Sequence, residues 1–153
     1  MNATTTMPHS LKTNKIIRAW LNERNQLLSL YCELSDSVQN EAGEALIHLR
    51  LDQFCELLVD YISAGHFEVY AELLDLDKLC DRQSDTLSGL YSLLTANTGA
   101  VLAYNDLLTR QAADEIDQSE IREPLSELGE LMVSRFDWED QLLTLQAYKA
   151  LAA

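Results

Sequence analysis

The chain has 153 residues, of which 47% are hydrophobic, and carries 25 acidic against 11 basic residues, for a net charge of −14. This size and hydrophobic content predict one globular domain and exclude a disordered chain, and the scarcity of glycine and proline favours helices over a sandwich or barrel. The negative charge argues against phosphate backbones and anionic lipids as partners, so we expect neither nucleic-acid nor membrane binding. It favours a basic protein surface or a small cation, with solubility alone as the alternative explanation.

The amino-terminal segment and the cysteines give no signal for export, anchoring or disulfides. Residues 1–13 lack the charged region and apolar run of a signal peptide and are expected to form a mobile tail. No stretch approaches the ~18 apolar residues of a membrane span. Cys32, Cys55 and Cys80 are widely spaced and free of any CxxC pair, which argues against a disulfide framework or a zinc ribbon and indicates thiols in a reducing cytoplasm.

From residue 14 onward, apolar residues recur with the 3.6-residue period of helices. The first helix is predicted from residue 14 to residue 34, and Ser35, Asp36 and Ser37 are expected to form a break after it. The second helix is predicted over residues 43–75, with two adjoining apolar stripes and a bend near Gly65.

A third helix is predicted over residues 84–112, and a polar loop at 114–119 follows it. Its inward side chains are expected to be Leu87, Leu90, Tyr91, Leu94, Val101, Leu102 and Leu108. The fourth helix is predicted to begin between residues 117 and 124, with Pro124 in or near its first turn, where a missing N–H group matters least. Four long helices joined by short loops predict an all-α, antiparallel up-and-down four-helix bundle that forms a single domain over residues 14–153.

The sequence offers little for metal or covalent chemistry. A di-iron bundle needs two Glu-x-x-His pairs, but Ala45 and Ser63 stand three positions before His48 and His66. The sequence contains no GxSxG motif and no glycine-rich phosphate loop. We therefore expect no metal, no other cofactor and no catalytic residue, and a metal or redox enzyme is the least favoured class.

Three polar residues fall on or beside apolar stripes. His66 has the helical phase of Val59 and Ile62, Glu139 has the phase of Met132 and Phe136, and Arg135 is nearby. An unpaired polar group costs free energy when it is buried, so these side chains are expected to satisfy one another. The favoured interpretation is a buried hydrogen-bonded network that fixes the helix register. The alternative is a ligand cavity lined by His66, Arg135 and Glu139.

Asp60 differs from these because it lies at the margin of an apolar stripe. It shares a helical face with Ala64 and Phe67, four and seven residues later. An acidic residue beside an aromatic one suits a contact with a basic partner. A solvated flank of an amphipathic helix is the alternative, and the phase alone does not decide between them.

Three separated segments resemble the regulator of sigma D family, Rsd and AlgQ. The central one is "LRLDQFCELLVDYISAGHFEVYAELL" at residues 49–74. The others are "AWLNERNQLLSLYCEL" at 19–34 and "LGELMVSRFDWEDQLL" at 128–143, and the short "ANT" at 96–98 also agrees. The resemblance covers most of the chain and is weaker at residues 1–14, 75–92 and 110–124.

The resemblance implies a helical-bundle protein of the gammaproteobacterial cytoplasm that is not an enzyme. Such an anti-sigma factor binds the primary sigma factor of RNA polymerase, chiefly through domain 4, which reads the −35 promoter element, and sequesters it. Other regulatory proteins stay open as additional partners. The alternative function is a small-molecule sensor with a ligand cavity around His66, Arg135 and Glu139.

The same resemblance suggests which residues contact the sigma factor. It marks the aspartate of the "LVDY" segment, Asp60 here, as important for sigma binding. Trp20, Leu21, Arg24 and Phe67 join it as candidates from their motif membership and helical phase. Trp20 has a core position as its alternative, because tryptophan is highly buried on average.

Overall fold

The computed structural model describes residues 9–73, 81–113 and 118–152, and within these ranges it contains helices and no strand. Three of the four long helices are uninterrupted, and the second helix along the chain is followed directly by a π-helical turn and a short helix. The elements are α1 (His9–Gln39), α2 (Glu44–Ala64), the π-helical turn η1 (Gly65–Val69), α3 (Tyr70–Leu73), α4 (Asp81–Ala113) and α5 (Gln118–Ala152).

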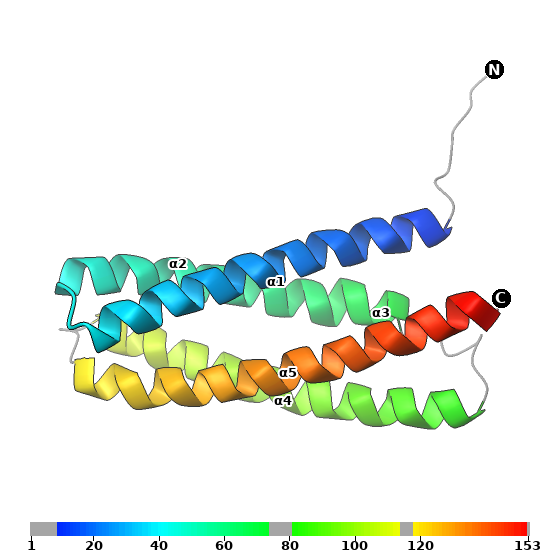
Figure 1. Ribbon diagram of the computed structural model, residues 1–153. Helices are drawn as coiled ribbons and strands as arrows, with labels where there is room; N and C mark the ends of the chain where they lie inside the picture. Colours follow the sequence, from blue (N-terminus) through cyan, green and yellow to red (C-terminus); the bar gives the residue numbers. More distant parts are fainter. Residues whose placement is uncertain (1–8, 74–80, 114–117, 153) are drawn as a thin grey trace, which may run out of the picture.

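The long helices form an antiparallel up-and-down bundle (Figure 1). α1 and α4 run in one direction, and α2 and α5 run in the other. Around the bundle, α1 packs on α2, α2 on α4, α4 on α5, and α5 on α1. The predicted fold class is therefore confirmed. None of the helices described is long and apolar enough to cross a membrane.

The prediction of a break at residues 35–37 was wrong, because α1 continues through them to Gln39. The hydroxyl of Ser37 donates a 2.8 Å hydrogen bond to the carbonyl of Glu33, one turn earlier, so this serine is satisfied inside a helix. The chain turns instead after Gln39, where Glu41 adopts a left-handed backbone conformation with φ of 52°.

The helix ends also differ from the sequence prediction. α1 begins at His9, so residues 9–13 of the expected tail are helical, and residues 1–8 lie outside the described residues. α5, in contrast, begins at Gln118, within the predicted range of 117–124, and Pro124 lies in its second turn. Residues 114–117 of the expected loop are likewise outside the description.

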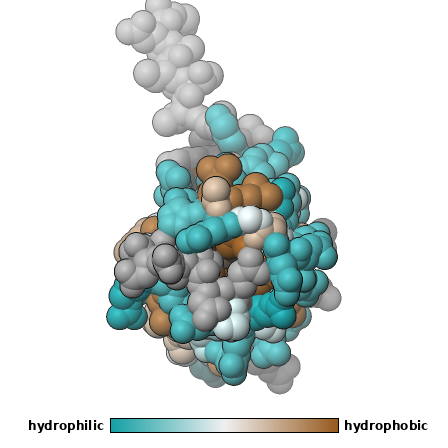
Figure 2. All heavy atoms as spheres, turned by 90° about the vertical axis from the view of Figure 1, so that its left-hand side faces the viewer, coloured by the Kyte–Doolittle hydropathy of each residue, from teal (hydrophilic) through white to brown (hydrophobic). Residues whose placement is uncertain are grey.

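The core runs the length of the bundle and is apolar near the α1–α2 turn, where Leu34, Val38, Ile47 and Leu51 are buried. Tyr91, which was expected to point inward, is 38% exposed. Figure 2 looks onto the end of the bundle that carries this turn and shows hydrophobic residues bordered by hydrophilic ones. At this end the first turns of α2 expose Leu46 and Leu49, by 41% and 55%.

Candidate functional site

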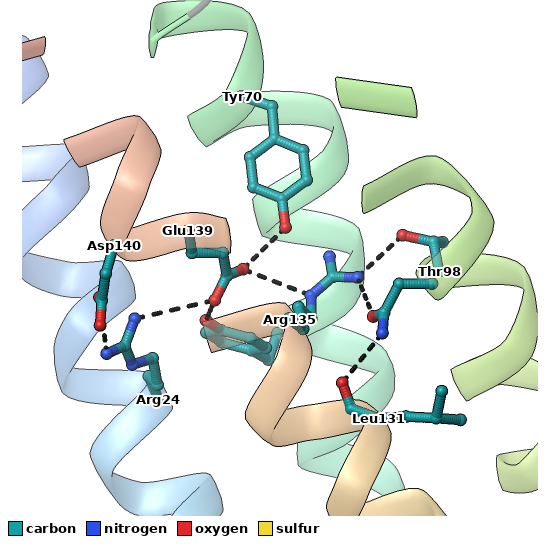
Figure 3. Close-up of polar contacts among 9 residues, drawn as sticks. Arg24, Tyr70, Thr98, Leu131, Arg135, Glu139 and Asp140 are labelled. Atoms are coloured by element: carbon teal, nitrogen blue, oxygen red, sulfur yellow. Dashed lines mark hydrogen bonds and ion pairs between the residues drawn. The ribbon is translucent and has the colours of Figure 1, made fainter. Parts of the chain in front are cut away.

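A buried carboxylate joins several helices in the interior of the bundle (Figure 3). Glu139 of α5 is fully buried and accepts hydrogen bonds from the hydroxyls of Tyr61, at 2.5 Å, and Tyr70, at 2.7 Å. Nε of Arg135, one turn earlier on α5, lies 3.3 Å from Oε2 of Glu139. The expected contact between Arg135 and Glu139 is present. The other partners of Glu139, the two tyrosines, come from α2 and α3.

The other side of Arg135 ties α4 to this centre. Its Nη1 donates to Oδ1 of Asn97 at 3.1 Å and to Oγ1 of Thr98 at 2.9 Å. Asn97 in turn donates to the carbonyl of Leu131 on α5 at 2.9 Å. Asn97 and Thr98 belong to the "ANT" segment. Neither their charge nor their helical phase singled them out from the sequence, but this motif could have.

Arg24 connects α1 to the same centre. Its Nη2 lies 2.9 Å from Oδ1 of Asp140, and its Nη1 lies 3.8 Å from Oε1 of Glu139. The guanidinium also covers the ring of Phe136, with 4.9 Å between Cζ and the ring centroid. Arg24, with 16% of its side chain exposed, therefore bridges the buried Glu139 and Asp140, whose side chain is 57% exposed. We call the set of Arg24, Tyr61, Tyr70, Asn97, Thr98, Arg135, Glu139 and Asp140 the polar network.

Burial and pairing act against each other on Glu139. Burial raises the pKa of its carboxyl group, and Arg135, the two tyrosine hydroxyls and Arg24 oppose that rise. Burial and the neighbouring Glu139 also raise the pKa of Tyr61 and Tyr70. Both tyrosines therefore remain protonated donors, which keeps two hydrogen bonds on the carboxylate.

His66 does not belong to the polar network, and the expectation that it pairs with Arg135 or Glu139 was wrong. It is only half-buried, and its ring stacks on Tyr91 of α4 with a centroid distance of 5.9 Å. Its Nδ1 is buried without a hydrogen-bond partner. Glu139 accepts from two tyrosines and Nη1 of Arg135 donates to Asn97 and Thr98, which favours the structural network over the ligand cavity, while Nη2 of Arg135 is buried without a hydrogen-bond partner.

Asp60 and Phe67 are both exposed, and Phe67 is 79% exposed. Partial burial and the negative charges of Asp60 and Glu68 raise the pKa of Glu23, so Glu23 of α1 lies close enough to both carboxylates to be repelled by them. Glu23 and Glu68 also line a groove of about 290 Å³ between α1 and α2–η1. We call Glu23, Asp60, Phe67 and Glu68 the acidic–aromatic face.

Glu23 and Glu68 were not singled out from the sequence, because the chain holds 25 acidic residues and helical phase alone does not bring two helices together. Among the residues that the structure describes, no group of three or more histidine, cysteine, aspartate or glutamate side chains could hold a metal ion.

The other candidates lie elsewhere. Trp20 is only 2% exposed and stacks on Tyr61, with 5.7 Å between ring centroids, so the structure assigns it to the core and removes it from the surface candidates. Its burial follows from the α1–α2 packing, which places the indole against Gly65. Leu21 is half-buried and lines a different hollow on α1, with Ile17 among its neighbours.

The fold and the site define a helical-bundle protein with an interior held by polar contacts and an accessible face suited to another protein. Residues 2–146 match the family model described as "Regulator of RNA polymerase sigma(70) subunit, Rsd/AlgQ". The chain therefore belongs to the Rsd/AlgQ family. Members of this family regulate the sigma(70) subunit of RNA polymerase, and it is not a known family of enzymes.

Curated relatives agree with the family match. The chain is 35% identical over 136 residues to "Regulator of sigma D" of Enterobacter sp. (strain 638), which covers 87% of this chain and 81% of that protein. It is 32% identical to the protein of the same name from Yersinia pseudotuberculosis serotype O:1b (strain IP 31758), over 86% and 79% of the two chains. For the Yersinia enterocolitica protein the identity is 31%, over 86% and 80%.

Proposed function

We propose that this protein is a cytoplasmic anti-sigma factor that binds the primary, housekeeping sigma factor of RNA polymerase. Contact is mainly with domain 4, the domain that reads the −35 element, and binding sequesters the sigma factor from the polymerase. The observation that carries this proposal is the acidic–aromatic face, where the charges of Asp60 and Glu68 act on Glu23 and an exposed phenylalanine, Phe67, lies beside Glu68 in the chain. We also propose that the chain binds neither nucleic acid nor membrane directly, given its net charge of −14.

The chemistry of the face suits a domain that binds DNA. Such a domain carries a basic surface, which the carboxylates of Glu23, Asp60 and Glu68 complement. Complementary charge speeds the encounter and selects the partner, whereas affinity depends mostly on a few buried anchors. Phe67 is the large side chain available as an anchor at this face.

The direct test is calorimetric titration of the isolated −35-reading domain into the full chain at low and at moderate salt. We expect binding that weakens as salt increases, because screening removes attraction between opposite charges. Asp60→Ala should weaken binding by roughly tenfold, within the range found for well-placed interface residues. Absence of binding at low salt, or full binding by Asp60→Ala, would contradict the proposal.

Asp106→Ala is a matched control, because it removes the same charge from an exposed position on α4. It lies fifteen residues beyond Tyr91, the α4 residue that contacts η1, which corresponds to about 22 Å along the helix. We expect this variant to bind like the original chain. Equal losses for Asp60→Ala and Asp106→Ala would indicate a general charge effect instead of a specific face.

Sequestration makes a separate prediction. If the chain covers the DNA-reading surface of the domain, a duplex that carries the −35 element should compete with it for the domain. We expect increasing amounts of the chain to release labelled duplex in an anisotropy assay, and Asp60→Ala to require roughly ten times more protein. Formation of a ternary complex would show that the chain binds elsewhere on the sigma factor.

A further inference from the structure

The spacing of buried residues changes at η1. Along α2 the buried positions repeat after seven residues, and across η1 they repeat after eight. The three successive sets are Phe54, Cys55 and Leu58; Tyr61, Ile62 and Gly65; and Val69, Tyr70 and Leu73. Seven residues are close to two turns of an α-helix, so the segment between Gly65 and Val69 holds one residue more than a regular helix needs. The π-helical turn absorbs that residue.

The extra residue decides which way Tyr70 points. At about 100° per residue, two positions nine apart, such as Tyr61 and Tyr70, would lie about 180° apart on a regular helix. With one residue absorbed by η1, they are placed as if eight apart, at about 80°. Both hydroxyls then reach the same carboxylate, at 2.5 Å and 2.7 Å from the oxygens of Glu139.

Glu139 thereby holds the π-helical turn from both sides. Tyr61 precedes η1 and Tyr70 follows it, and Trp20 packs between them, with ring centroids 5.7 Å and 6.1 Å away. Gly65 allows this approach, because a Cβ atom there would lie 3.3 Å from Nε1 of Trp20. A regular helix would turn Tyr70 away from Glu139 and leave the buried carboxylate with one tyrosine donor fewer.

Phe67 lies in the middle of the segment that is held in this way. It is 79% exposed, and its ring meets the ring of His66 edge-on at 5.1 Å. His66 in turn stacks on Tyr91 of α4. The direction of Phe67 therefore depends on η1, and η1 is held by hydrogen bonds to a residue that lies inside the bundle.

We infer that Glu139 is a positioning residue for partner binding. It does not touch the partner: it holds η1 through Tyr61 and Tyr70, and η1 projects Phe67 from the acidic–aromatic face as an anchor for an apolar pocket on a basic domain. The identity of that partner rests on the proposed function, and the direction of Phe67 does not.

A first experiment tests the positioning without any partner. In solution NMR of the full chain, Tyr70→Phe and Glu139→Gln should weaken the contacts between the rings of Phe67 and His66. Amide exchange at residues 66–69 should rise roughly fivefold, as the loss of one buried hydrogen bond implies. Asp137→Asn, at an exposed carboxylate on the same helix, is the control and should leave both readouts unchanged. Unchanged contacts and exchange in a folded Tyr70→Phe chain would overturn the inference.

A second experiment asks whether Tyr70 acts through Phe67. In titrations with the −35-reading domain, Phe67→Ala should weaken binding by roughly thirtyfold, the loss typical of a buried anchor. Tyr70→Phe should weaken it by roughly fivefold. The double variant should lose no more than Phe67→Ala alone, because the tyrosine then has no anchor to position. If the losses of the two single variants multiply in the double variant, the inference is overturned. If the original chain itself fails to bind the domain, the proposed function is contradicted, and the NMR experiment alone decides whether Glu139 positions Phe67.

Deletion of Phe67 gives the sharpest contrast. It restores the seven-residue spacing, so that Val69, Tyr70 and Leu73 keep their core positions on a regular helix. We expect this deletion to melt at a temperature no lower than Phe67→Ala and to bind the domain as weakly as Phe67→Ala does. A deletion chain that melts well below Phe67→Ala would show that η1 does not absorb an extra residue, and the inference would fail.

Discussion

The two halves of the bundle use the same long helices but are stabilised differently. Near the α1–α2 turn, Leu34, Ile47 and Leu51 pack in an apolar core between regular helices. Near η1, Arg135 and Glu139 are just as completely buried, and a helix changes its register to supply their partners. The apolar half tolerates small changes because dispersion and burial are spread over many contacts. The polar half depends on a few directed bonds, so each of its members should be harder to replace.

The largest effect is expected from Arg135→Met. The change keeps much of the side-chain volume but leaves Glu139 buried without its nearest charged partner, which typically costs about 3–5 kcal/mol. The free energy of unfolding from urea titration measures this loss. Arg122→Met is the control, because its side chain is 51% exposed and its ion pair with Glu41 spans 4.0 Å. A loss below about 1 kcal/mol for Arg135→Met would show that the polar half does not depend on this pair.

A somewhat smaller effect is expected in the apolar half. Leu51→Ala removes a side chain that is 1% exposed, and the transfer and cavity costs together should reduce the free energy of unfolding by about 3 kcal/mol. Leu49→Ala, at a position 55% exposed on the same helix, is the control and should change it little. If Leu51→Ala lowers the free energy of unfolding more than Arg135→Met does, the contrast between the two halves is reversed.

A change of about 1 kcal/mol is expected from Tyr31→Phe, which removes one hydrogen bond. The Tyr31 hydroxyl donates to the carbonyl of Leu125 at 2.9 Å, and its ring fits over Gly129. Urea titration again gives the measurement. Because this tyrosine sits in the apolar half and outside the polar network, a loss as large as that of Arg135→Met would argue that single polar contacts matter equally in both halves.

The smallest expected effect is a change in the free energy of unfolding with pH. Burial raises the pKa of Glu139 in the folded chain above its ordinary value of 4.5. As the pH rises above about 4.5, the unfolded chain releases this proton before the folded chain does, so the stabilisation linked to Glu139 is complete below that pH and declines above it. The stability difference between the original chain and Glu139→Gln should therefore be largest near pH 4 and shrink toward neutral pH. A difference that grows with pH would contradict this assignment.

Much of the candidate site could be predicted, but its geometry could not. Asp60 and Phe67 were found because they share a face of one helix, and one helix is enough for helical phase to work. Glu139 was found because it is polar at an apolar phase, and Arg135 because it lies near Glu139 in the sequence. Tyr70 was missed as a partner of Glu139, because the phase counted along α2 does not hold beyond η1. His66 was misassigned because the stripe it shares lies at the edge of the core: Val59, seven residues earlier, is itself 37% exposed.

The sequence by itself determined the four long helices, their antiparallel order and the apolar stripes, because these follow from a period repeated over many residues. Its separated motifs also identified the family. Only the tertiary structure decided where the period fails, which of the buried polar groups meet, and that Trp20 lies in the core while Glu23 joins Asp60 and Glu68. Those facts depend on contacts between helices that are distant in sequence, where one added residue rotates every following side chain by about 100°.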